Sequence, residues 1–89
     1  MSVHYDSEAA TAIQGVYDSP TLGRLGDRLE ELLDILEHSP GDSRVRRERT
    51  LDPKLWQFTV YGDGEVFMVL WEHAGPHDEP HVRYAGLRP

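Results

Sequence analysis

Hydrophobic residues recur through the first forty positions at the spacing of amphipathic helices. In residues 20–38 a leucine stripe follows one helical face while acidic side chains occupy the others. The stripe consists of Leu22, Leu25, Leu29, Leu32, Leu33 and Leu36. Ser19 and Pro20 suit the start of this helix, and the Pro40-Gly41 pair ends it. A shorter apolar stripe over residues 9–17 predicts another helix before it.

After residue 43 the pattern becomes that of strands. Residues 55–61 alternate between apolar and polar side chains, while residues 66–71 form the nearly continuous apolar run of a central strand. Residues 44–51 predict a charged edge strand, and residues 81–85 predict a last strand after a polar loop at 73–80. A short first strand at residues 3–5 is compatible with the sequence.

The leucine stripe needs a surface and the apolar face of the sheet needs a cover, so packing one on the other satisfies both. The sequence therefore predicts an α+β fold, with two N-terminal helices packed on a twisted antiparallel sheet of about four strands. We expect a single domain over residues 1–89. The leucine stripe also leaves open a homodimer interface as an alternative. The predicted core positions of the strand at residues 55–61 are Trp56, Phe58 and Val60.

Net charge is −7, and the first 43 residues carry all of it, with two basic and nine acidic side chains. Such an acidic chain argues against non-specific nucleic-acid binding, which depends on neutralising phosphates. Residues 44–54 are locally basic and suit a directed contact with an anionic partner. The alternative is that these charges only protect an edge strand from pairing with other sheets.

Composition narrows the remaining function classes. The chain has no cysteine, which excludes disulfides and thiolate metal sites and fits a cytoplasmic location. No apolar run is long enough to span a membrane, so we expect no membrane association. His73, His77 and His81 recur every four residues, but Pro76 and Pro80 forbid the helix that would align them. We therefore predict neither a metal nor a cofactor.

Several of these segments together resemble the RelE/ParE superfamily of bacterial toxins. The segments that carry the resemblance are Tyr5–Ala9, Leu32–Pro40, Arg46–Thr50, Leu55–Val60, Val69–Trp71 and Tyr84–Arg88. The resemblance implies a toxin-like protein that inhibits translation by ribosome-associated mRNA cleavage, or acts on another target such as DNA gyrase. It also implies that a cognate antitoxin protein is a partner, with the ribosome and its mRNA as the target of the cutting members.

The resemblance implies four candidate catalytic residues, because arginine and lysine bind phosphate and stabilise developing negative charge. They are Arg47, Arg49, Lys54 and Arg88. Two expected family residues are missing. Met68 stands where the central strand would carry arginine, and the sequence ends at Pro89 without a terminal tyrosine. We therefore expect a depleted catalytic set, and with it a weak or inactive endoribonuclease or a target-binding inhibitor.

Binding is predicted to involve the remaining basic and aromatic side chains of the sheet, since exposed aromatic rings can stack on bases or on a protein partner. The candidate binding residues are Arg46, Tyr61, Trp71, Arg83 and Tyr84. Three of them, Tyr61, Trp71 and Tyr84, are expected to stay exposed for this purpose. The alternative function is a small non-enzymatic protein-interaction module that uses the sheet surface or the acidic helices.

Overall fold

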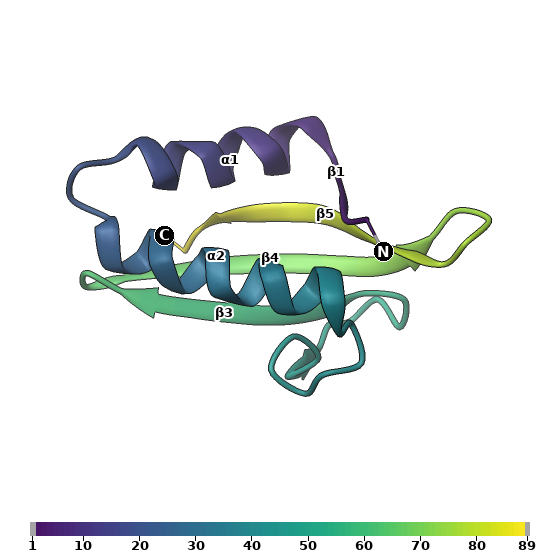
Figure 1. The fold of residues 1–89 in the computed structure, drawn as a ribbon. Coiled ribbons are helices and arrows are strands. Elements are labelled where there is room, and N and C mark those ends of the chain that lie inside the picture. The colour runs from purple at the N-terminus through teal and green to yellow at the C-terminus, as the bar shows by residue number, and fades with distance from the viewer. Residues whose placement is uncertain (1, 89) are drawn as a thin grey trace.

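Two helices lie on one face of a five-stranded sheet in the computed structural model, which describes residues 2–88 (Figure 1). The elements are β1 (His4–Tyr5), α1 (Ser7–Asp18), α2 (Gly23–His38), β2 (Glu48–Arg49), β3 (Trp56–Gly62), β4 (Glu65–Ala74) and β5 (Glu79–Leu87). The strand order is β1-β5-β4-β3-β2. The predicted α+β class with two N-terminal helices is confirmed. The expectation about a terminal tyrosine concerns Pro89, which lies outside the described residues.

The sheet differs from the prediction because it is mixed and has five strands. Strand β1 runs parallel to β5, with His4 opposite His81, whereas the other three strand pairs are antiparallel. Parallel neighbours share no hairpin turn and are joined through a long crossover. Here the two helices and three other strands intervene between β1 and β5. No local pattern therefore marks this pair.

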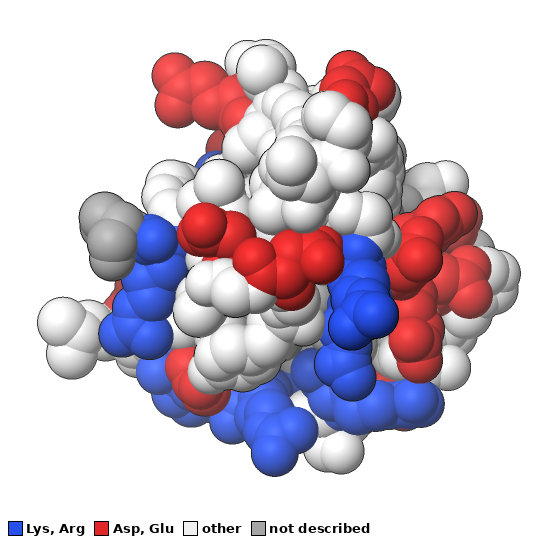
Figure 2. All heavy atoms as spheres, turned by 90° about the vertical axis from the view of Figure 1, so that its left-hand side faces the viewer, with Lys and Arg blue, Asp and Glu red and all other residues white. Residues whose placement is uncertain are grey.

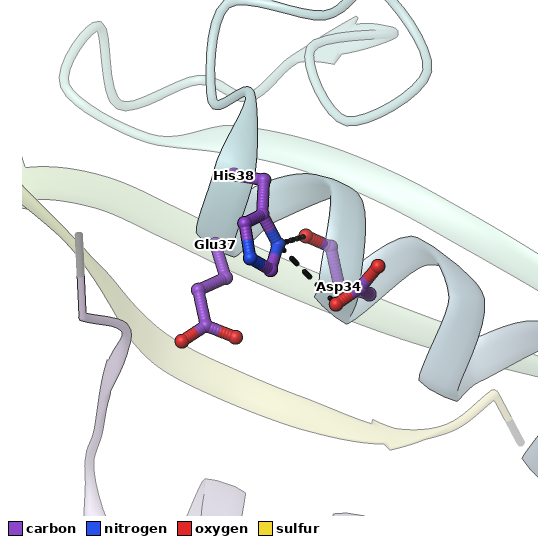
Figure 3. Close-up of side chains that lie close together, drawn as sticks. All are labelled: Asp34, Glu37 and His38. Atoms are coloured by element: carbon purple, nitrogen blue, oxygen red, sulfur yellow. Dashed lines mark hydrogen bonds and ion pairs between the residues drawn. The ribbon is translucent and has the colours of Figure 1, made fainter.

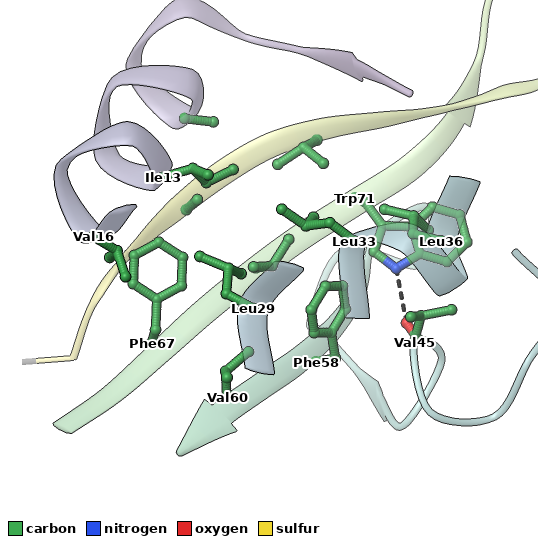
Figure 4. Close-up of a cluster of buried hydrophobic side chains, with 14 of the residues drawn as sticks. Ile13, Val16, Leu29, Leu33, Leu36, Val45, Phe58, Val60, Phe67 and Trp71 are labelled. Atoms are coloured by element: carbon green, nitrogen blue, oxygen red, sulfur yellow. Dashed lines mark hydrogen bonds between the residues drawn. The ribbon is translucent and has the colours of Figure 1, made fainter. Parts of the chain in front are cut away.

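The leucine stripe of α2 covers the sheet, as predicted. Leu25, Leu29 and Leu36 are fully buried, and Leu33 is nearly so. Figure 4 shows Leu29, Leu33 and Leu36 in one cluster with sheet and α1 side chains. The sheet contributes Phe58, Val60, Phe67 and Trp71, and α1 contributes Ile13 and Val16. Leu25 belongs to the same cluster. This burial stabilises the fold by roughly 1.5–3 kcal/mol for each large apolar side chain. Within residues 2–88 no helix is both long and apolar enough to cross a membrane.

Trp71 corrects one sequence prediction, because it belongs to the core and not to an exposed surface. Its exposed fraction is 0%, and its indole Nε1–H donates a hydrogen bond to the carbonyl of Val45 at 2.8 Å (Figure 4). Strand β4 alternates, with Phe67, Val69 and Trp71 buried and Met68 partly exposed. The helices cover only one face of the sheet, so β4 is not buried on both faces as its apolar run suggested.

The predicted core of β3 is confirmed for two of its three members. Phe58 and Val60 are buried, with exposed fractions of 1% and 2%. Trp56 is only partly buried against the same cluster, because it lies where the short strand β2 ends the sheet. The side chains of Thr59 and Tyr61 fall on the opposite, uncovered face.

Two loop and strand boundaries were wrong. The predicted strand at residues 44–51 is mostly turn, and only Glu48–Arg49 pairs with β3, because Val45 is drawn fully into the core. The predicted loop at 73–80 shrinks to a tight turn between β4 and β5, in which Gly75 and Asp78 have positive φ. Pro80 is buried at the start of β5, near the first position of a strand where proline is tolerated.

Helix α2 begins at Gly23, later than predicted, and its N-terminus is capped from the sheet. The Asp63 carboxylate accepts hydrogen bonds from the backbone N–H groups of Arg24 at 2.9 Å and Leu25 at 3.0 Å. A carboxylate at this position also interacts favourably with the helix dipole. Gly62 lies directly against the same helix turn, where an added Cβ would be only 2.8 Å from the backbone nitrogen of Leu25.

We predict that Gly62→Ala destabilises the protein by about 1–3 kcal/mol, because the new methyl group must displace the α2 backbone. Gly15→Ala is the matched control, since nothing lies within 4 Å of the Cβ that it adds on α1. That control should stabilise the protein by about 0.5–1 kcal/mol through its better helix propensity. Urea unfolding of both variants measures the difference, and equal stability of the two would contradict the contact.

We predict that Asp63→Ala lowers the free energy of unfolding by about 1 kcal/mol through loss of the cap. Asp63→Asn is the control, because asparagine keeps an acceptor oxygen and tolerates the positive φ of 54° at this position. Thermal unfolding should therefore rank the proteins as wild type, then Asn, then Ala. An Ala variant as stable as the wild type would show that the cap contributes nothing.

Candidate functional site

A surface hollow lies between α2, the edge of β3 and the loop after α2. Its volume is about 430 Å³, and an adjoining hollow shares Arg28 and Tyr61 with it. We call the two together the arginine groove, after the side chains that line it: Arg24, Arg28, Arg44 and Arg47, with Tyr61. Figure 2 shows Lys and Arg side chains gathered around the lower part of one end of the molecule, beside patches of Asp and Glu.

The charges of the arginine groove are mixed but leave cations available. Within residues 2–88, Arg28 and Arg47 form neither an ion pair nor a side-chain hydrogen bond, whereas Arg44 pairs with Asp42 at 2.9 Å. Hydrogen bonds from Arg44 lower the pKa of Asp42 to about 2. Three arginines face two glutamates, Glu31 and Glu48, in the larger hollow. The groove therefore suits a small anionic group better than a long polyanion.

Local structure explains how these arginines come together. Arg24 and Arg28 are four residues apart on α2 and therefore share one face of the helix. The sequence offered this spacing, but on an acidic helix it indicated only a solvated face. Arg44 precedes the inward-facing Val45 and Arg47 follows it by two positions, and the burial of Val45 holds this loop beside β3.

Two predicted site residues, Arg46 and Arg49, hold the loop instead of facing an open site. Arg46 donates from Nε to the carbonyl of Pro40 at 2.7 Å, and its guanidinium carbon lies 5.2 Å from the Trp56 ring centroid. The guanidinium carbon of Arg49 lies 3.9 Å from the centroid of the same Trp56 ring, and Arg49 donates a hydrogen bond to the carbonyl of Pro53 at 2.7 Å. Cation–π contacts of this kind contribute about 0.5–1 kcal/mol at exposed positions.

His73 is fixed by the same cluster. Arg46 can only donate, so the 2.8 Å contact between its Nη2 and His73 Nε2 makes Nε2 the acceptor. The Nδ1 atom then carries the proton and donates to the carbonyl of Asp78 at 2.8 Å. Through these two contacts the imidazole of His73 joins the loop after α2 to the turn between β4 and β5.

Arg83 is also engaged within the chain, at the β1–β5 edge of the sheet. It lies 3.4 Å from Asp6 and 3.3 Å from Glu72. Asp6 in turn contacts His81 at 2.7 Å, and this hydrogen bond is the main reason that its pKa is lowered. The guanidinium of Arg83, which the sequence predicted for binding, therefore forms ion pairs with two carboxylates of its own chain.

The remaining predicted residues are dispersed. Lys54 lies in the loop between β2 and β3, and Arg88 follows β5, where its backbone N–H donates to the carbonyl of Val66. Of the four candidate catalytic residues, only Arg47 lines the arginine groove. Tyr61 and Tyr84 are exposed by 60% and 51%, as expected for a binding surface. Tyr84 lies on the uncovered face of the sheet, where its hydroxyl covers Gly86.

The three histidines that recur in the sequence do not gather within residues 2–88. The metal-ligand types that do meet there are Asp34, Glu37 and His38, at the end of α2 (Figure 3). All three are exposed, and His38 Nδ1 already lies 3.0 Å from the Asp34 carbonyl and 3.3 Å from its carboxylate. This arrangement serves the C-terminus of the helix, where a cation is favourable.

Comparison with known proteins gives no family. The chain matches no protein-family model, no curated protein and no solved structure. The resemblance to the RelE/ParE superfamily therefore stays a hypothesis that rests on the sequence segments described above.

We predict that His38 titrates above the ordinary imidazole pKa of about 6.5. The hydrogen bond to the Asp34 carbonyl is the main cause of the raised pKa of His38, and the negative charge of the Asp34 carboxylate raises it further. Because the folded pKa is the higher one, this contribution to stability is complete below the unfolded pKa and is lost as pH rises through the folded value. NMR titration should show a lower midpoint in Asp34→Asn and no change in Asp27→Asn. An unchanged midpoint in Asp34→Asn would exclude the carboxylate contribution.

Proposed function

We propose that this protein is a toxin-like, RelE/ParE-like member of a bacterial toxin–antitoxin pair, and that it binds its target through the arginine groove. The observation that carries the proposal is the groove itself. Arg28 and Arg47 line the hollow without a carboxylate partner in the described chain, next to Thr59–Tyr61 at the edge of β3. These groups can hold a small anionic part of a target by charge and hydrogen bonding.

The arrangement of elements supports the same proposal. A short strand, two helices and the remaining strands follow one another in the order that the resemblance implies. The helices cover one face of the sheet and leave the other face available to a partner. An antitoxin protein is the partner that the proposal names.

The proposed action is binding, with the catalytic set depleted. Cleavage of RNA requires phosphate-binding and proton-transferring groups around the same atoms. Here Arg47 lines the groove, Arg49 is held against Trp56, and Arg88 lies beyond the end of β5. Met68 supplies no charge on the uncovered face. The family cleavage mechanism therefore has less support than target binding.

A second candidate function, a protein-interaction module, is favoured by the uncovered face of the sheet. Met68 and Leu70 lie there, partly exposed, between β3 and β5. Leu70 is paired with Tyr84, whose ring is half exposed. Apolar side chains that remain partly exposed in the middle of a sheet are suitable for burial against another protein.

Induced expression in a bacterial host tests the proposal. We predict growth arrest without new mRNA ends, as measured by colony counts and by mapping of RNA 5′ ends. The double variant Arg28→Glu, Arg47→Glu should restore growth because it reverses two groove cations that have no ion-pair partner in the described chain. Ala10→Glu is the control, because it adds a negative charge at an exposed position of α1 outside the groove lining, and it should still arrest growth.

Three outcomes would count against this function. Cleavage of mRNA by the wild-type protein would contradict the binding mechanism. Arrest by the folded double variant would remove the groove from the mechanism. Normal growth with the wild-type protein present at high level would contradict the toxin function and leave the interaction module as the better account.

A further inference from the structure

The outer edge of β3 is open over Thr59–Tyr61. Strand β2 pairs with β3 only at two positions, Glu48 with Gln57 and Arg49 with Trp56. Beyond Gln57 no strand of the described chain lies on that side of β3. The last part of β3 is therefore an edge of the sheet, although β2 pairs with the first part of the same strand.

The hairpin register shows which backbone groups face outward at this edge. The turn at Asp63 and Gly64 has two residues, and both have positive φ, as in the turn that best fits a tight hairpin. The closing pair, Gly62 and Glu65, then exchanges hydrogen bonds, and every second pair does the same. Val60 therefore bonds toward β4, whereas Thr59 and Tyr61 direct their N–H and C=O groups away from it.

These outward groups have no partner within residues 2–88. No turn, loop or cap hydrogen bond reaches the backbone of Thr59 or Tyr61, and β2 ends its pairing before them. Edge strands are commonly protected by proline, by an inward charge or by a bulge. Thr59, Val60 and Tyr61 include none of these, and their register with β4 is continuous.

The open edge faces the arginine groove. Thr59, Val60 and Tyr61 line the hollow of about 430 Å³ together with Arg28 and Arg47. Leu32, only partly buried, lies in the same lining. Unpaired donors and acceptors, free space and cations therefore occur together, and the three residues offer about 10 Å of strand for pairing.

We propose that this edge accepts an added β-strand from a partner protein, and that the added segment is extended and acidic. Its backbone would pair with Thr59 and Tyr61, as in other cases of recognition by strand addition. Its side chain opposite Val60 would point toward α2, over Leu32 and beside Arg28 and Arg47. This inference does not rest on the toxin function, because it follows from the register and the charges alone.

Two other occupants fit less well. A second copy of the chain, paired symmetrically about Val60, would bring Arg28 and Arg47 of one protomer toward those of the other, and like charges facing each other are destabilising. A nucleic-acid phosphate offers only acceptors, so it leaves the outward carbonyls of Thr59 and Tyr61 unpaired. Glu31, Glu48 and the net charge of −7 also oppose a polyanion.

The test uses the isotopically labelled chain and a synthetic capped peptide of six residues that alternates glutamate and valine. In the free protein, amide hydrogen exchange should be faster at Thr59 and Tyr61 than at Phe58 and Val60. The peptide should bind saturably and slow exchange at Thr59 and Tyr61. A peptide of the same sequence with alternate backbone amides methylated should bind about tenfold more weakly or worse, because it loses two or more hydrogen bonds.

Variants of the protein separate charge from pairing. Arg28→Glu with Arg47→Glu should weaken binding of the unmodified peptide about tenfold or more, since it reverses two cations. Ala10→Glu, which adds a negative charge at an exposed position of α1 outside the groove lining, should bind like the wild type. Equal binding of the methylated and unmodified peptides would overturn strand addition. Slow exchange at Thr59 and Tyr61 in the protein without peptide would also overturn it, whether the protection is independent of protein concentration or increases with it. Protection of the same two amides by a single-stranded oligonucleotide would overturn it as well.

Discussion

Burial of Trp71 is the constraint on which the rest of this structure depends. Trp71 is the largest fully buried side chain, and its indole N–H requires a partner once it leaves water. The carbonyl of Val45 supplies that partner at 2.8 Å and brings the loop after α2 against the sheet. With Val45 drawn inward, the chain cannot run along β3, and β2 is reduced to Glu48–Arg49. The open edge of β3 and the arginine groove both follow from this one contact.

The same contact divides the basic residues between two roles. Arg46 and Arg49 lie against Trp56 and bond to the carbonyls of Pro40 and Pro53, so their charges hold the loop in place. Arg47 points into the groove, where Arg28 arrives from α2. A run of arginines that looks uniform in sequence therefore contains both loop anchors and free cations. The free cations are the ones available to a partner.

The opposite end of β3 supplies the second fixed point of the groove. Asp63 caps α2 from the hairpin, and Gly62 permits close approach of the two backbones. Together these contacts set the distance between α2 and β3, and hence the width of the hollow between them. The groove is therefore a consequence of how the helix is attached at one end and how the loop is tied to Trp71 at the other. A target or a partner strand would meet a preformed surface.

The sequence alone determined the α+β class, the two helices and the burial of the α2 leucines, Phe58 and Val60, because these depend on the local periodicity of apolar side chains. Tertiary structure decided the burial of Trp71, the pairing of β1 with β5 and the grouping of Arg28 with Arg47. Each of these joins segments far apart in the chain, and residue order carries no signal for such contacts. Arg83 shows the same limit, since its partner Asp6 lies at the other end of the sequence. The sequence therefore shows which side chains can bind an anion, whereas the tertiary structure decides which of them are free to do so.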